Sequence, residues 1–163
     1  MPLAVYPASF DPITYGHLDI ATRAAAIFDE LILAVYDRPL KNLLFSTAER
    51  VELVKQAVAH LPNVRVDTYS GLTVDFAKRV GAKVLVRGLR AATDFEHEFQ
   101  MAHLNHQLSP GIDVVCLMAS QEYSLLSSSA VKEIAALDGN VDFMVAPHVA
   151  VALRDAFSRK GSR

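Results

Sequence analysis

The chain has 163 residues, 52% of them hydrophobic and 21% charged, which is the composition of one compact domain with a sizeable core. Its net charge of −2 excludes a protein that attracts nucleic acid or anionic membrane by overall positive charge, so a phosphate ligand would need locally placed cations. The single cysteine, Cys116, excludes a disulfide framework and a cysteine-based zinc site. It falls in an apolar run, and we expect it to fill core space.

No apolar run approaches the length of a membrane span, and the first predicted strand begins almost at the N-terminus, which leaves no room for a signal peptide. The sequence therefore predicts a cytoplasmic protein. We expect neither nucleic acid nor a membrane among its partners.

Strand-like and helix-like segments alternate along the chain. Strands of the buried type are predicted at residues 3–6, 31–36, 84–86 and 112–118, and an edge-type strand at 64–69. Helices are predicted over about 15–28, 46–60, 73–80, 93–108 and 127–137, and a last one from 147, with a frayed polar tail at 158–163. The alternation predicts an α/β fold over residues 1–163, a single-domain doubly wound (Rossmann-like) sheet of five mainly parallel strands with helices on both faces.

Several residues favour these helix boundaries. Thr14 is a suitable N-cap, and the segments 46–49 and 93–96 have the pattern of capping boxes. Gly81 suits the C′ position of the third helix, and Pro147 suits the first position of the last helix.

The first turn has the features of an anion site. A turn stiffened by Pro7 and Pro12 joins the first strand to a helix start that contains Gly16. The free N–H groups of that helix start and its positive dipole end favour anionic ligands. His17 stands in the same turn, where the dipole disfavours the imidazolium, so we expect a neutral N–H donor.

Ligands of such sheets bind beyond the carboxyl ends of the strands, and polar residues of this chain follow the strands in the same way. Ser9 and His17 follow the first strand, Lys41 the second, and Arg87 and Arg90 the fourth; Ser127–Ser129 follow the fifth. The cations among them suit a polyanionic phosphate substrate. Gly88, between the two arginines, would let the backbone approach a ligand closely.

Two sets of motifs carry a resemblance to known enzymes. The run Ser9-Phe10-Asp11-Pro12-x-Thr14-x-Gly16-His17 resembles the signature of the nucleotidyltransferase superfamily. The resemblance narrows to one family through the segments 87–90, 94–98, 100–105, 122–124 and 127–133, which resemble those of the bacterial phosphopantetheine adenylyltransferases. The likeness runs from Leu3 to about Phe157 with the motifs in matching order. The resemblance implies transfer of AMP from ATP to 4′-phosphopantetheine, which gives dephospho-coenzyme A and pyrophosphate in the penultimate step of coenzyme A synthesis.

The resemblance also implies roles for individual residues. The catalytic group would be His17, as transition-state stabiliser, with Lys41 and Arg90. The ATP-binding group would be Ser9, Phe10, His17, Gly88, Leu89, Arg90, Glu98, Tyr123, Ser124, Leu125, Leu126, Ser127, Ser128 and Ser129. Ser9, Lys41, Thr73 and Arg87 would bind the acceptor substrate. Mg²⁺ is expected on the ATP phosphates, with no protein ligand assigned, and a homohexamer with feedback by coenzyme A is implied.

Some residues depart from the family pattern or invite another interpretation. Ala8 replaces the usual glycine, Ser9 the common threonine, and Asn42 a frequent second lysine. His97, His103 and His106 raise a metal hypothesis that exposed or interface histidines explain more simply. We expect Lys132 and Glu133 to be solvated charges.

Two other functional classes remain open from the residues. Nicotinate-mononucleotide adenylyltransferases and small cytidylyltransferases share the first motif but differ in the later ones. A non-catalytic nucleotide-binding module on a similar sheet is the alternative from outside the enzymes.

Overall fold

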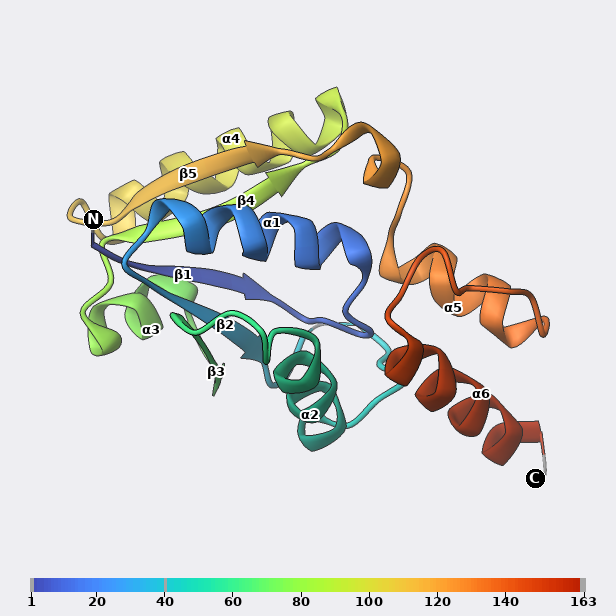
Figure 1. Cartoon of the computed structure of the whole chain (residues 1–163). Coiled ribbons are helices and arrows are strands. Elements are labelled where there is room, and N and C mark those ends of the chain that lie inside the picture. The colour runs from blue at the N-terminus through green and yellow to red at the C-terminus, as the bar shows by residue number, and fades with distance from the viewer. Residues whose placement is uncertain (1, 40, 162–163) are drawn as a thin grey trace.

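The computed structural model describes residues 2–39 and 41–161. Its centre is one sheet of five parallel strands in the order β3-β2-β1-β4-β5 (Figure 1). The strands are β1 (Leu3–Ala8), β2 (Glu30–Tyr36), β3 (Val64–Tyr69), β4 (Val84–Leu89) and β5 (Asp113–Met118). The predicted doubly wound sheet is confirmed, and β3 occupies an edge as its alternating pattern predicted.

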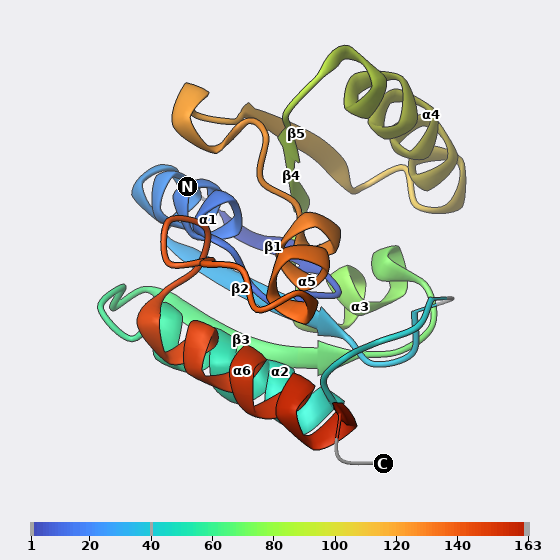
Figure 2. The ribbon, with the colours of Figure 1, turned by 90° about the vertical axis from the view of Figure 1, so that its right-hand side faces the viewer.

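The helices are α1 (Tyr15–Ile27), α2 (Thr47–Ala57), α3 (Thr73–Val80), α4 (Ala92–Leu108), α5 (Ser128–Ala136) and α6 (Pro147–Gly161), with a 3₁₀ turn η1 at Gln121–Tyr123. Figure 2 shows α1, α2 and α6 on one side of the sheet and α3 and α4 on the other. None of the described helices is long and apolar enough to cross a membrane.

Burial on both faces explains the nearly continuous apolar sequence of the central strands. Leu31, Leu33 and Val35 of β2 belong to the core beneath α1, α2 and α6. Ile32 and Ala34 of the same strand point to the opposite face, where α3 packs.

Three predicted helix boundaries are confirmed. The Ser46 hydroxyl accepts the Glu49 N–H at 3.2 Å, and the Glu49 carboxylate accepts the Ser46 N–H at 2.8 Å, which completes a capping box. Gly81 ends α3 with a φ of +78°, a left-handed conformation that favours glycine. Pro147 begins α6.

The predicted capping box at 93–96 is wrong. Ala91 is the N-cap of α4, and no side chain caps that helix. The carboxylate of Asp94 instead accepts the backbone N–H of Arg90 at 2.9 Å. α4 therefore begins at Ala92, and Thr93 lies inside its first turn rather than at its cap.

Two further expectations are corrected. Cys116 is exposed rather than buried, because β5 is an edge strand. The tail expected to fray from Ser158 is helical as far as Gly161, and the Arg159 side chain donates to the Asp155 carbonyl within this last part of α6. Residues 162–163 lie outside the described residues.

A matched pair of substitutions tests the caps. Ser46→Ala removes a hydroxyl that caps α2, so we expect a loss of about 1 kcal/mol in the free energy of unfolding. Thr93→Ala removes a hydroxyl that does not cap α4, so we expect a change within about 0.5 kcal/mol. Urea unfolding measures both, and equal losses in the two variants would contradict this assignment of the caps.

Candidate active site

A cleft of about 530 Å³ opens at the carboxyl ends of the strands. Most of the predicted site residues line it, namely Ser9, Phe10, His17, Lys41, Thr73, Arg87, Gly88, Arg90, Glu98, Tyr123, Leu126, Ser127, Ser128 and Ser129. Three predicted residues do not: Leu89 is buried in β4, and Ser124 and Leu125 lie on the exposed loop after η1, where Leu125 is 90% exposed. The structure thus brings residues from six separate segments to one place.

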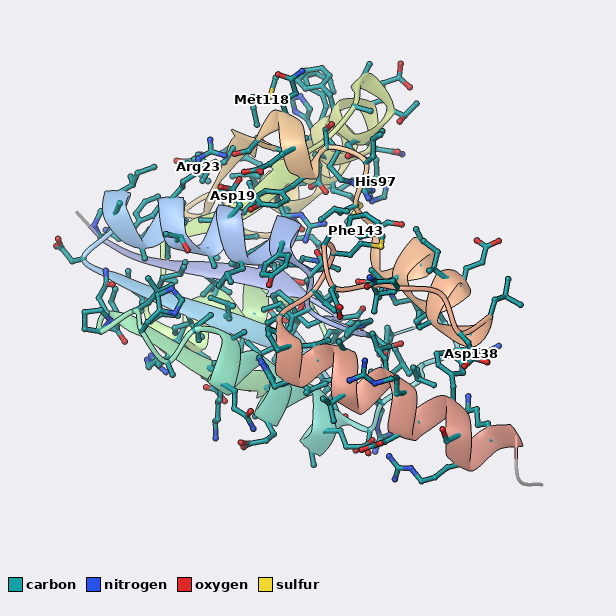
Figure 3. All side chains as sticks on the ribbon, turned by 45° about the vertical axis from the view of Figure 1, so that its right-hand side comes forward. Asp19, Arg23, His97, Met118, Asp138 and Phe143 are labelled. Atoms are coloured by element: carbon teal, nitrogen blue, oxygen red, sulfur yellow. The ribbon has the colours of Figure 1, made fainter. Side chains whose placement is uncertain are left out.

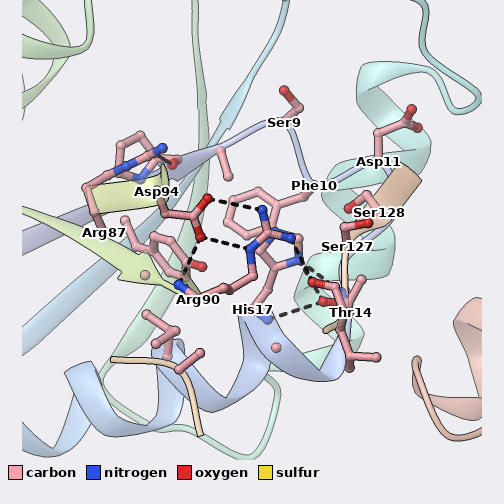
Figure 4. A pocket seen from close by; sticks show the side chains of 18 of the residues that line it. Ser9, Phe10, Asp11, Thr14, His17, Arg87, Arg90, Asp94, Ser127 and Ser128 are labelled. Carbon is pink, nitrogen blue, oxygen red and sulfur yellow. Dashed lines mark hydrogen bonds and ion pairs between the residues drawn. The ribbon is translucent and has the colours of Figure 1, made fainter. Parts of the chain in front are cut away.

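The start of α1 fixes the orientation of His17. The Thr14 N–H donates to His17 Nδ1 at 3.0 Å, and the His17 N–H donates to Thr14 Oγ1 at 3.3 Å (Figure 4). Thr14 is thus the N-cap that the sequence predicted, and the His17 side chain closes the reciprocal half of a capping box. Because a backbone N–H can only donate, Nδ1 is the acceptor, and Nε2 carries the proton of the neutral ring.

His17 is neutral at physiological pH. Burial, followed by the charges of Arg90, Arg87 and Lys41, lowers its pKa from 6.5 to about 4. The sequence predicted a neutral donor through the helix dipole; the charge state agrees, while burial is the main cause. The ring also packs edge-on against Phe10, with the two ring centroids 5.1 Å apart.

The backbone strain of the first turn lies at Phe10 and not at Ala8. Phe10 has a φ of +51°, whereas among the described residues the only other non-glycine residue with positive φ is Asp138. Ala8 therefore fits its position without strain. Phe10 is 1% exposed and packs against Tyr6 and His17, which holds the unusual conformation in place.

Carboxylates of α4 orient both arginines of the cleft. Arg87 Nη2 and Glu98 Oε1 are 2.8 Å apart, and Arg87 Nη1 donates to the Pro7 carbonyl at 2.7 Å. Arg90 Nε donates to Asp94 at 3.1 Å, and its Nη1 donates to the Leu126 carbonyl at 2.9 Å. Hydrogen bonds from Arg90 outweigh the effect of burial and hold the pKa of Asp94 below its usual value.

Gly88 has a packing role that the sequence did not reveal. A Cβ at this position would lie 3.1 Å from Ile20 Cγ1, so the absence of a side chain lets β4 pack closely on α1. This contact sets the distance between the helix that carries His17 and the strand that carries the arginines.

The segment after β5 is fixed to α1 through polar contacts. Asp19 accepts from Arg23 at 3.1 Å and from the Ser120 hydroxyl at 2.8 Å, and Arg23 donates to the Met118 carbonyl at 2.7 Å. Figure 3 shows Asp19, Arg23 and Met118 together at this end of the molecule. These bonds position the loop that leads to Tyr123 and to the start of α5.

The serine run begins α5 as predicted. The Ser127 side chain accepts the Ala130 N–H at 3.0 Å as N-cap, and Ser128 Oγ donates to the Pro12 carbonyl at 2.8 Å. The second bond joins the start of α5 to the turn before His17. The N–H groups of this helix start add to the anion-binding capacity of the cleft.

Two charged side chains beside the cleft have contacts that the sequence did not predict. Lys132 is not the solvated charge that was expected, because its ammonium lies 2.9 Å from the buried Asp11 carboxylate. Arg50 is fully buried and donates to the Ser9 carbonyl at 2.8 Å. Its spacing from Leu53, Val54 and Ala57 places it on the buried face of α2, a signal that the sequence does contain.

The structure shows where two of the histidines that raised the metal hypothesis lie. His97 lines the cleft, and His103 packs against Phe99 with ring centroids 4.5 Å apart. Within residues 2–39 and 41–161, no three His, Cys, Asp or Glu side chains gather as metal ligands. Asp11, Asp94 and Glu98 line the cleft, and each is already paired with a cation.

Comparisons with known proteins show which family this chain resembles. Residues 5–134 match the cytidylyltransferase-like family. The phosphopantetheine adenylyltransferase of Herpetosiphon aurantiacus is 64% identical over 96% of this chain and 95% of its own length. The enzyme of the same name from Chloroflexus aurantiacus is 53% identical over 99% of this chain and 100% of its own length.

A solved structure supports the fold independently. It is a structure from Vibrio parahaemolyticus described as a nicotinate-nucleotide adenylyltransferase, and it superposes with a TM-score of 0.71. The alignment covers 98% of this chain and 93% of that chain at 16% identity, a level that bears on the fold alone. With full-length relatives above half identity and a cleft that gathers the motif residues, the chain belongs to the phosphopantetheine adenylyltransferases, a family of enzymes within the nucleotidyltransferase superfamily.

Proposed function

We propose that this chain performs its family's reaction by direct in-line attack of the acceptor phosphate on the α-phosphorus of ATP. The reaction transfers AMP from ATP to 4′-phosphopantetheine and yields dephospho-coenzyme A and pyrophosphate. A bond forms between the acceptor phosphate oxygen and the α-phosphorus, while the bond from the α-phosphorus to the bridging oxygen of pyrophosphate breaks. The observation that carries the proposal is the convergence of His17, Lys41, Arg87 and Arg90 on one cleft with the start of α5.

The attacking group needs no general base, because a phosphate oxygen is already ionised at neutral pH. Catalysis then depends on holding two phosphates in line and on stabilising the charge that develops at the α-phosphate. The proton on His17 Nε2 would serve as a preorganised donor to an α-phosphate oxygen. Arg90 and the serine run at the start of α5 would hold the ATP phosphates beside it.

The acceptor has a separate place in this arrangement. Ser9, Lys41 and Arg87, which line the cleft, would bind the phosphate of the acceptor. A second hollow of about 470 Å³ shares Tyr36, Tyr69 and Thr73 with the first and continues along α4. Leu72, Met101, Leu104, Asn105 and Leu108 are among its mostly apolar lining, which suits the long uncharged arm of phosphopantetheine.

Mg²⁺ would enter with ATP in this proposal. The carboxylates that line the cleft are engaged by Lys132, Arg87 and Arg90, so they do not form a ready ligand set. Mg²⁺ commonly retains waters and uses phosphate oxygens of the substrate. We therefore assign the ion to the ATP phosphates and to water.

Assembly, feedback and location complete the proposal. Phe95 and Phe99 of α4, which line neither hollow, are 54% and 56% exposed, which supports association of this helix with another copy in a homohexamer. Coenzyme A carries the same arm and an adenosine group, so it would compete at the same cleft. The cytoplasmic location that the sequence predicted is part of this proposal.

The acceptor assay tests the proposed function. ATP and Mg²⁺ are offered with 4′-phosphopantetheine, nicotinate mononucleotide or glycerol 3-phosphate in parallel, and pyrophosphate release is measured. We expect release with 4′-phosphopantetheine alone, together with a product of the mass of dephospho-coenzyme A. Release with another acceptor only would contradict the substrate, and ATP binding without any release would favour the non-catalytic module.

The role of His17 is tested by a pair of variants. His17→Ala should lower kcat by on the order of 10²–10³, because one preorganised donor to the transition state is lost. Thr14→Ala removes the hydroxyl of the same cap but keeps the imidazole and the Thr14 N–H that orients it. It should cost less than about tenfold in kcat while lowering stability by about 1 kcal/mol. A turnover of His17→Ala close to that of the unaltered enzyme would remove His17 from the mechanism.

The lowered pKa of His17 gives a pH prediction. Between pH 6.5 and about 4 the unfolded chain binds a proton at His17 that the folded protein does not. The contribution of His17 therefore makes the free energy of unfolding fall as the pH drops through this window, and it is constant above it. Nitrogen-15 NMR of the imidazole should show the proton on Nε2 at pH 7 and a midpoint near 4. A midpoint near 6.5, or a proton on Nδ1, would contradict the capping geometry.

A further inference from the structure

Asp11 is a buried carboxylate that joins three segments of the cleft. It lies in the turn between β1 and α1 and is 1% exposed. Its Oδ1 accepts the Phe45 N–H at 3.0 Å, and its Oδ2 accepts the Leu44 N–H at 2.9 Å. The Lys132 ammonium, from the second turn of α5, donates to Oδ2 at 2.9 Å. One side chain thus connects the first turn, the loop after Lys41 and the helix that the serine run begins.

The loop that Asp11 holds is the one that carries Lys41. Residues 41–45 have no helix or strand conformation, so neighbouring groups must fix the position of their backbone. Leu44 and Phe45 obtain two of these bonds from Asp11, three and four residues after Lys41. Arg50 holds the same end from the other side, since its Nε donates to the Phe45 carbonyl at 3.3 Å.

The ion pair adds a link that runs to the ATP side of the cleft. Lys132 is on the helix whose first residues, Ser128 and Ser129, line the cleft. In Figure 4, Asp11 lies on the same side of the turn as Ser127 and Ser128. A displacement of Lys132 would therefore change the place of Lys41 relative to the start of α5.

Stability alone is a weak reason for such a pair. Burying two opposite charges has a desolvation cost that often cancels their attraction, and well-packed apolar residues commonly replace such pairs without loss of stability. The pair does have strict geometry, because the same carboxylate oxygen must meet both the Leu44 N–H and the ammonium. This geometry fixes the position of the Leu44 backbone relative to Lys132.

We propose that the Asp11–Lys132 ion pair positions Lys41 against the ATP-binding start of α5, and that Lys132 is a positioning residue for the adenylyl transfer. Lys132 is not among the residues that line the cleft, so it would act through Asp11 and the loop 41–45. The inference rests on the proposed role of Lys41 at the reacting phosphates. It extends that role to a residue outside the cleft lining.

A double-mutant cycle in the full-length enzyme tests the coupling. Lys132→Met keeps the apolar stem and removes the charge, and we expect a drop of about tenfold in kcat/KM for 4′-phosphopantetheine, because the loop loses its fixed position. In a Lys41→Ala background the same change should cost less than about twofold, since the group that it positions is already absent. Lys132→Arg, which can still donate to Asp11, should restore at least half of the activity. Lys55→Met, an exposed lysine of α2, is the matched control and should leave activity unchanged.

Hydrogen exchange gives a readout that does not depend on substrate. Exchange of the Leu44 and Phe45 amides should be faster in Lys132→Met than in Lys55→Met. Equal fold losses with and without Lys41, unchanged exchange of these two amides, or failure of Lys132→Met to fold would each overturn the proposal. Absence of pyrophosphate release from the unaltered enzyme would instead count against the proposed function, because the exchange experiment would still report on the loop.

Discussion

The cleft depends on one buried cation, the guanidinium of Arg50. Parallel strands that end together leave carbonyl groups without ladder partners, and these groups need donors when they are buried. Arg50 donates at 2.8 Å to the carbonyls of both Ser9 and Tyr36, which follow β1 and end β2. It also donates to the carbonyls of Asp37 and Phe45 at 3.3 Å. The ends of two strands and the loop after Lys41 are therefore held around a single planar group, and the proposed phosphate-binding positions are arranged around that centre.

Positive charge in the cleft is local and already oriented. In a protein with a net charge of −2, Arg87 and Arg90 approach the same site, and each is held by a carboxylate of α4. This pairing reduces the repulsion between the arginines and fixes their planes before a substrate arrives. The phosphates of the proposed substrates would then meet groups whose orientation needs little further ordering, so less of the binding free energy would be lost to side-chain entropy.

Local patterns predicted most of the fold, and long-range contacts account for what they did not predict. The strand and helix alternation and the Ser46 cap depend on neighbours in sequence, and both are confirmed. The Thr93 box fails because Ala91 is the N-cap of α4, which places Thr93 inside the first turn of the helix. The sequence around Lys132 is typical of a surface lysine, but in the fold its ammonium contacts Asp11, 121 residues away in the chain. The helical spacing of Arg50 indicates its burial, but no local pattern indicates the carbonyls that it meets.

The double use of His17 has a consequence for how this chain can change over time. The imidazole closes the first turn of α1 through Nδ1 and leaves Nε2 for the proposed contact with the α-phosphate. At many catalytic positions, replacement of the functional side chain raises stability, because active-site residues are selected for function rather than for stability. Here the fold and the proposed reaction favour the same residue in the same tautomer. Replacement of His17 by alanine would therefore remove the proposed donor and half of the capping box of α1 in a single step.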